Sequence, residues 1–182
     1  MKEKYIAFLR GINVGGHHKV PMGELRAEME KLGFEEVTTI LNTGNIIFDA
    51  ISEDLEQLEK RISEHLEKVF GFPIPTILRK WEMIDGLLKN NPFQEEIITK
   101  DIRLYVSFLK KDAEMDFQLP WISEDKGYKI IEKRENAIWS VLDVSTLKTT
   151  KAMGILERQF GKKNITTRNW NTIKRIEKKL LK

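Results

Sequence analysis

The chain has 182 residues and contains no cysteine, which excludes several kinds of chemistry at once. Without thiols there is no disulfide framework, no thiolate metal site and no cysteine nucleophile. Long apolar runs are also missing, since no stretch approaches the roughly 18 residues that a membrane helix needs. The apolar start at Tyr5 is closed by Arg10 and is too short for a signal peptide. We therefore expect a cytoplasmic protein without membrane association.

The composition is that of a soluble globular protein, with 41% hydrophobic and 32% charged residues. The length suits one ordinary domain or two small ones. The net charge of +3 hides a split, because the chain from Lys126 onward has 15 Lys and Arg against 5 Asp and Glu, whereas the remainder has 16 against 23. Such a basic tail suits a nucleic acid or an acidic partner, two halves that attract each other, or lysines that simply face water.

A pattern of about fifteen residues occurs twice, roughly ninety residues apart. In both copies a Leu-Glu pair leads to Phe-Gly and is followed by Thr, Arg and Trp. The first copy is Leu66–Gly71 with Thr76, Arg79 and Trp81, and the second is Leu156–Gly161 with Thr166, Arg168 and Trp170. One deletion between Thr and Arg aligns them. The pattern predicts that the chain is two versions of one structural unit.

Hydrophobic periodicity and turn residues predict the elements of the first half. We expect strands over 5–10, 37–41, 46–49 and 74–79, the last at a sheet edge because two prolines flank its start. We expect helices from Pro21 to Gly33, over 55–71 and, as a short closing helix, over 81–88. Residues 42–45 have the composition of a hairpin turn. The order β-α-β-β-α-β is the ferredoxin-like one.

The second half can be interpreted in the same way. Its strands are expected over 103–109, 129–132, 137–143 and near 165, and its helices over 149–160 and from 168; residues 111–117 are the only candidate for its first helix. The predicted fold class is therefore α+β, with two ferredoxin-like subdomains from an internal duplication, each followed by a closing helix. The subdomains span 1–91 and 92–182. The central strands Tyr5–Leu9 and Leu104–Phe108 are apolar on both faces, so we expect both faces to be covered.

Three separated motifs resemble those of a known family. They are Arg10–Gly16 after the first strand, Gly44–Phe48 in the hairpin and Thr166–Thr172 near the end. Together they resemble the bacterial domain-of-unknown-function family 1697 over nearly the whole chain. The resemblance implies a pair of ferredoxin-like α+β subdomains and no established activity, ligand or catalytic residue. The family pattern has a lysine after the glycine pair, where this chain has His17 and His18, with Lys19 two positions on.

The first candidate site is the glycine loop. Gly11, Gly15 and Gly16 allow positive φ and a close backbone approach, and Arg10 beside them suits a phosphate or carboxylate. The glycines have the skeleton of a P-loop, but histidines replace its lysine and hydroxyl residue, and the Rossmann spacing is absent. The alternative is a tight turn that lets Val14 tuck into the core.

The histidines do not predict a metal site. His17 and His18 are adjacent on an extended loop and point in opposite directions, which leaves only His65 as a further ligand. We expect no metal and no cofactor. A single histidine acting as acid or base has no visible partner in the sequence.

The second candidate site is the start of the closing helix. Thr166 or Thr167 can cap a helix that begins at Arg168, whose free N–H groups would suit an anion. Alternatively Trp170 is a core anchor and Asn169 bonds the loop. The side of this helix opposite its apolar stripe is basic, with Lys174, Arg175, Lys178, Lys179 and Lys182.

Three functions remain open from the sequence. The first is a module that binds an anionic small ligand between the 10–16 loop and the 166–172 helix start, with these candidate residues: Arg10, Gly11, Asn13, Gly15, Gly16, Asn45, Thr166, Thr167, Arg168 and Asn169. The second is an enzyme acting on a phosphorylated or carboxylated small molecule, without catalytic residues that can be named. The third is a nucleic-acid binder that uses Lys174, Arg175, Lys178 and Lys179. The sequence does not indicate the oligomeric state.

Overall fold

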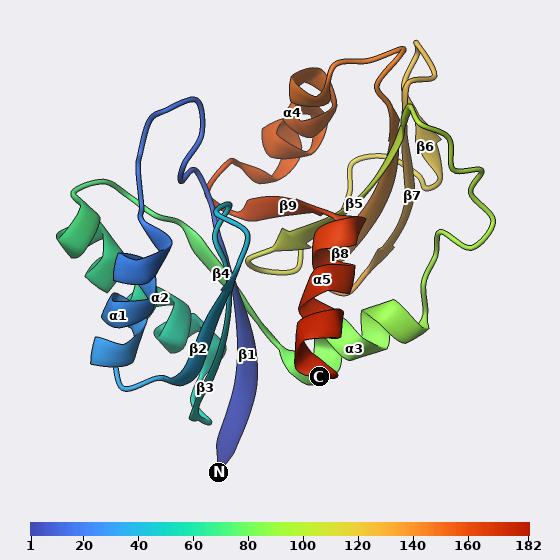
Figure 1. The fold of residues 1–182 in the computed structure, drawn as a ribbon. Helices are drawn as coiled ribbons and strands as arrows, with labels where there is room; N and C mark the ends of the chain where they lie inside the picture. Colours follow the sequence, from blue (N-terminus) through green and yellow to red (C-terminus); the bar gives the residue numbers. More distant parts are fainter. The chain divides into compact units, whose positions relative to one another are not determined.

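Two antiparallel sheets and five helices make up the chain, a mixed α+β arrangement described for residues 1–182 by a computed structural model (Figure 1). The chain divides into two compact units, the first unit from Met1 to Gly86 and the second unit from Leu87 to Lys182. Their boundary falls inside helix α3. None of the helices is long and apolar enough to cross a membrane.

The first unit contains the elements predicted for the first half, in the predicted order. They are β1 (Lys2–Leu9), α1 (Met22–Lys31), β2 (Glu35–Ile40), β3 (Asn45–Ile51), α2 (Leu55–Phe70), β4 (Thr76–Lys80) and the first part of α3 (Trp81–Lys89), which continues into the second unit. The strand order in the sheet is β2-β3-β1-β4, and every neighbouring pair is antiparallel. The hairpin between β2 and β3 and the edge position of β4 are therefore as predicted.

Helices α1 and α2 cover one face of this sheet (Figure 1). Leu25 of α1 and Ile62 of α2 lie in the same buried cluster as Tyr5 and Phe48 of the strands. Burying such side chains contributes about 1.5–3 kcal/mol each. Ile6 and other side chains of the opposite face are buried too, as expected from the two-sided apolar pattern of β1.

Local signals explain where α2 begins and ends. The side chain of Asp54 accepts a hydrogen bond of 3.0 Å from the N–H of Gln57, and the helix stops at Gly71, which has a φ of 83°. In its middle, the buried Glu59 accepts a hydrogen bond of 2.8 Å from the backbone N–H of Leu78 on β4. This carboxylate satisfies a donor on the edge strand that has no strand beside it on that side.

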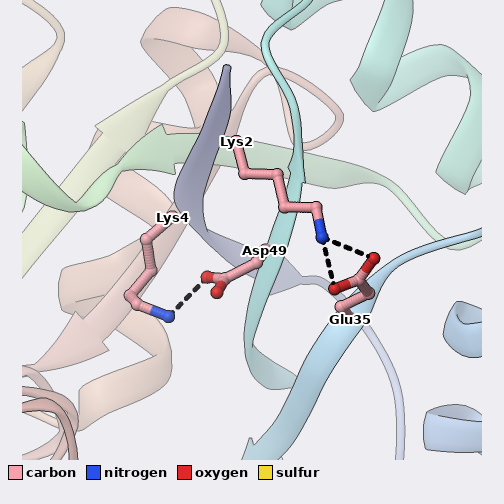
Figure 2. Close-up of polar contacts among 4 residues, drawn as sticks. All are labelled: Lys2, Lys4, Glu35 and Asp49. Carbon is pink, nitrogen blue, oxygen red and sulfur yellow. Dashed lines mark hydrogen bonds and ion pairs between the residues drawn. The ribbon is translucent and has the colours of Figure 1, made fainter.

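Ion pairs link the outer ends of the strands in the first unit (Figure 2). Lys4 on β1 pairs with Asp49, which lies directly opposite on β3. Lys2 reaches Glu35 on β2, with its Nζ 2.8 and 2.6 Å from the two carboxylate oxygens. Such partly exposed pairs contribute about 0.2–1 kcal/mol each. They favour the observed register because a one-residue slip would move each charge to the other face.

The contacts of Glu3 on β1 make the stability of the folded protein depend on pH in the acid range. Its carboxylate lies 2.7 Å from the Nζ of Lys80 and accepts a hydrogen bond of 2.8 Å from the hydroxyl of Tyr5. The hydrogen bond from Lys80, followed by that from Tyr5, lowers the pKa of Glu3 from 4.5 to about 2. Because the folded pKa is the lower one, this stabilisation is complete above pH 4.5 and is lost as the pH falls toward 2.

We expect Glu3→Gln to remove part of the acid dependence of stability. Urea denaturation at pH 7, 4.5 and 2.5 should show the variant less stable than the parent at pH 7, with a gap that narrows as the pH falls. Lys80→Met removes the main cause of the pKa shift of Glu3. Adding Glu3→Gln to the Lys80→Met variant should therefore change the stability at pH 7 less than Glu3→Gln does in the parent. A gap that stays constant from pH 7 to 2.5 would contradict this assignment.

The second unit contains a five-stranded sheet and the helices α4 and α5. Its elements are β5 (Ile102–Leu109), β6 (Trp121–Ile122), β7 (Tyr128–Arg134), β8 (Ala137–Asp143), α4 (Thr149–Phe160), β9 (Ile165–Asn169) and α5 (Trp170–Leu180). The strand order is β6-β7-β8-β5-β9. Helix α4 covers one face of this sheet, where Leu156 lies in a buried cluster with Tyr128 and Leu142.

The helix predicted over 111–117 is absent, and this part of the prediction is wrong. Residues 111–117 are irregular and lead to the short strand β6. Only Met115 and Phe117 are large and apolar here, and both pack against the core from the loop. Two apolar residues two positions apart cannot form a helical stripe, so tertiary packing without a helix buries them.

Candidate functional site

The glycine loop is a small hairpin between β1 and α1, visible as the blue loop in Figure 1. The N–H of His17 donates to the carbonyl of Val14 at 3.0 Å, and the N–H of Asn13 donates to the carbonyl of His18 at 3.0 Å. Gly15 and Gly16 between them have φ values of 58° and 78°. Positive φ at both central residues defines a type I′ turn, which explains why glycines stand there.

The expectation that Val14 tucks into the core is wrong, because its side chain is 65% exposed. The core positions of the loop are instead Ile12 and Val20, each 2% exposed. These two residues anchor the ends of the hairpin, while the two-residue turn keeps Val14 at its tip. The tip is therefore open to solvent, and a Cβ atom at Gly15 or Gly16 would meet no other atom within 4 Å.

Asn13 holds the base of this hairpin. Its Nδ2 donates to the carbonyl of Val20 at 3.0 Å and to the carbonyl of Asn42 at 2.7 Å, and its Oδ1 accepts from the N–H of Val20 at 2.8 Å. The amide thus ties the loop to the turn between β2 and β3. These bonds occupy both of its ends, so Asn13 shapes the loop and orders it in advance of any ligand.

A groove of about 380 Å³ opens between the hairpin and the start of α1. Its lining is Asn13, Gly16, Lys19, Val20, Pro21, Met22 and Asn42. Helix α1 has Pro21 at its N-cap, and no side chain caps its first N–H groups. These groups carry a partial positive charge, and the exposed Lys19 adds a full one. Glu24 in the first turn offsets part of this field.

Sequence reasoning missed this groove. The sequence pattern predicts a helix that begins at Pro21, but it favours an anion site on the glycines and not beside the helix start. The signal was available, since proline at a helix start provides no side-chain cap and Lys19 precedes it by two residues. Asn42 could not be assigned to the groove from the sequence, because it comes from a different turn.

Three other predicted ligand residues have the following places in the fold. Asn45 is buried, and its Nδ2 donates to the carbonyl of Ile40 at 2.9 Å and to Oγ1 of Thr43 at 3.1 Å, which holds the β2–β3 turn. Gly11 has a φ of 75° and lies at the exposed start of the loop. The backbone N–H of Arg10 donates to the carbonyl of Pro75 at 2.9 Å, and its side chain is half-buried.

No group of three or more His, Asp or Glu side chains is arranged to hold a metal ion. His18 stacks on Phe72 with ring centroids 4.3 Å apart, and its Nδ1 lies 3.1 Å from the carbonyl oxygen of Gly11. His65 on α2 contacts Glu28 on α1 at 2.8 Å. His17 is exposed on the hairpin.

The second predicted site has a different local structure from the one expected. Thr166, Thr167 and Arg168 do not begin a helix, because they belong to β9, which pairs with β5. Helix α5 begins at Trp170, and its cap is Asn169, whose side chain accepts a hydrogen bond of 2.9 Å from the N–H of Asn171. Pairing with a distant strand therefore overrides the local threonine cap signal.

Side chains of β9 are engaged within the second unit. Nη1 of Arg168 donates to Oγ1 of Thr166 at 2.8 Å and to the carbonyl of Thr167 at 3.0 Å. The hydroxyls of Thr167 and Ser107 share a hydrogen bond of 2.7 Å. Thr166 and Arg168 are buried. These contacts support a structural role for the threonine-arginine segment.

Arg168 also has a counterpart in the first unit. Arg79 faces Ile6 in the register of β4 with β1, and Arg168 faces Val106 in the register of β9 with β5. Both arginines are buried, with 4% and 9% exposure, and both donate to the carbonyl of the preceding residue. In both units a tryptophan two positions later begins a helix. The repeated arginine thus occupies one structural position twice.

Comparisons with known proteins indicate a family but no activity. The family model described as "Protein of unknown function (DUF1697)" matches residues 1–139. Among solved structures, the conserved bacterial protein SP0830 from Streptococcus pneumoniae is similar, with 26% identity, a TM-score of 0.76 and full coverage of both chains. No curated protein matches the chain.

Proposed function

The chain belongs to this family of proteins of unknown function, and we propose that it binds a small anionic ligand in the groove between the glycine hairpin and α1. The ligand would carry a phosphate or carboxylate group. The observation that carries the proposal is the start of α1, which lacks a side-chain cap and lines this groove together with Lys19.

The physical argument concerns unsatisfied donors. The first N–H groups of a helix have no partner within the helix, and an anion can accept hydrogen bonds from them. Lys19 adds a positive charge, and the bonds of Asn13 order the loop in advance, which lowers the entropy cost of binding. Thr166–Asn169 belong to β9 of the second unit, and the proposed groove does not include them.

Binding is favoured over catalysis because no carboxylate or imidazole lines the groove. A general acid or base has to lie within hydrogen-bond reach of the reacting group. An enzyme acting on a phosphorylated or carboxylated molecule is the alternative. It would be supported if a substrate that binds in the groove were turned over by the parent protein and not by a Lys19 variant.

The direct test is a titration of the 15N-labelled protein with sodium phosphate and sodium acetate, followed by NMR. We expect the amide signals of Met22, Gly23 and Glu24 to shift in a saturable way. Lys19→Ala should weaken the binding about five- to tenfold, since a hydrogen bond to a charged group is worth roughly 1–1.5 kcal/mol at an exposed site.

Lys163→Ala is the matched control, because it removes one exposed lysine from the second unit. It should bind as the parent does. Equal weakening by both variants would indicate an effect of net charge alone. Amide shifts that spare the start of α1 would exclude the groove as the site.

We also propose that the two units, Met1–Gly86 and Leu87–Lys182, are ferredoxin-like subdomains derived from an internal duplication. The sequence predicts the boundary between these subdomains a few residues later, at 91 and 92. The support is that β2-β3-β1-β4 and β7-β8-β5-β9 follow the same order, with β6 added and one helix missing in the second. The strand segments Tyr5–Leu9 and Tyr105–Leu109 also occupy equivalent registers. A cytoplasmic location remains a prediction.

A further inference from the structure

Helix α5 presents four exposed cations on one side. They are Lys174, Arg175, Lys178 and Lys179, here called the basic face. The other side of the helix is apolar, with Trp170, Ile173 and Ile176 buried within the protein. The basic face is part of the second unit and contains none of the residues that line the groove of the first.

The charges of the basic face are not neutralised. Some other cations of the second unit have acidic partners: Lys129 lies 2.7 Å from Glu96, and Lys133 lies 2.5 Å from Asp112. The four cations of the basic face form no ion pair. Glu177 is the only acidic residue on the helix. Four positive charges therefore lie within six residues that contain a single negative charge, Glu177.

Stability does not explain this arrangement. Lys174 and Lys178, like Arg175 and Lys179, are like-charge pairs four residues apart, which destabilise a helix by about 0.2–0.5 kcal/mol each. The helix dipole favours Lys178 and Lys179, which lie in the last turn, but its effect does not extend to the middle of the helix. A polyanionic partner would turn this repulsion into attraction.

The geometry favours a nucleic acid over a membrane. An amphipathic helix binds a lipid surface by inserting its apolar face, and that face of α5 is buried. The cations form two rows, with residues in each row separated by a rise of about 6 Å. Such rows suit a polymer with regularly spaced negative charges. The basic face contains no aromatic residue on which single-stranded bases could stack.

We propose that the basic face of α5 binds the phosphate backbone of double-stranded nucleic acid without reading the bases. Four phosphate contacts would release about four counterions. The logarithm of the affinity should then fall with the logarithm of the salt concentration with a slope of about −3.6, which is about a hundredfold loss between 50 and 200 mM salt. Replacing one base sequence by another should change the affinity little, because phosphate contacts carry no sequence information.

The test is fluorescence anisotropy of a labelled 20-base-pair DNA duplex with the full chain at 50, 100 and 200 mM salt. The variant changes the basic face in four places: Lys174→Gln, Arg175→Gln, Lys178→Gln and Lys179→Gln. We expect it to lose at least tenfold in affinity at 50 mM salt and to show a slope near zero. Thermal unfolding should show it as stable as the parent, since glutamine is a good helix former and the repulsion is removed.

The matched control removes four exposed lysines elsewhere in the second unit: Lys148→Gln, Lys151→Gln, Lys162→Gln and Lys163→Gln. It changes the net charge by the same amount and should bind like the parent. A second variant, with Lys174→Arg, Lys178→Arg and Lys179→Arg, keeps the charges and should retain binding even if the glutamine variant folds poorly.

Three results would overturn the proposal. The control could lose as much affinity as the glutamine variant, which would leave only a general charge effect. The arginine variant could fail to bind although it is folded. Alternatively, polyglutamate or vesicles of anionic phospholipid could bind the parent more tightly than the duplex, which would indicate a different class of partner.

Discussion

Replacing Trp170 by alanine should lower the free energy of unfolding by about 3–5 kcal/mol, the usual loss for a buried tryptophan. Trp170 is 2% exposed, and its ring meets the ring of Phe93 edge to face with centroids 5.4 Å apart. Its loss would leave a cavity where α5 packs against β5 and β9. Since domains of this size have a total stability of 5–15 kcal/mol, urea denaturation should show a large shift of the midpoint.

Trp81→Ala is the matched control for this experiment, because Trp81 begins α3 as Trp170 begins α5. Trp81 is only half-buried, so its loss should be clearly smaller. Trp170→Phe should also cost much less than alanine, since it keeps most of the ring and removes an indole N–H that has no hydrogen-bond partner. Equal losses at both tryptophans would show that the two repeats are packed alike.

Gly44→Ala should destabilise the first unit by about 2–5 kcal/mol, for two reasons that add. Gly44 has a φ of 87°, where an L side chain costs about 1–2 kcal/mol. A Cβ at this position would lie 2.7 Å from Cβ of Leu9 and 3.1 Å from Cδ1 of Ile12. Overpacking of this kind costs about 1–3 kcal/mol, because both neighbours are buried in the core.

Gly33→Ala separates these two contributions. Gly33 has nearly the same φ, 85°, but a Cβ there would meet nothing within 4 Å. Its replacement should therefore cost only the backbone contribution of about 1–2 kcal/mol. Thermal unfolding should place Gly44→Ala several degrees below Gly33→Ala, at about 2–4 °C per kcal/mol for a chain of this size. Equal melting temperatures would mean that the turn shifts to make room for the methyl group.

Much of the fold follows from local sequence signals. Glycine ends α2 at Gly71, proline precedes α1, and the 42–45 turn joins β2 and β3 as its composition predicts. The repeat predicted that equivalent strand and helix positions would occur twice, and Arg79 and Arg168 occupy such positions. The family resemblance is confirmed by the match over residues 1–139, and the third motif, Thr166–Thr172, lies outside the matched residues.

The candidate site was harder to predict, because its character depends on contacts between distant residues. Asn13 is a candidate ligand from its place in a glycine loop, but its bonds to Val20 and Asn42 show what its amide does. Thr166 is a residue type that often caps a helix, but pairing with β5 makes it part of a strand. Lys19 follows two histidines in the sequence, and nothing in that pattern predicts that it lines a groove.

The sequence by itself determined most of the strands and helix ends, the repeat and the clustering of cations on α5, because each depends on neighbours within a few residues. Periodicity, glycine and proline act locally, and so does the clustering of Lys174 to Lys179. Only the tertiary structure decided which polar groups remain available to a ligand. A hydrogen bond is satisfied by whichever group the fold brings near, and Asn42 and Ser107 come from other segments of the chain than their partners Asn13 and Thr167.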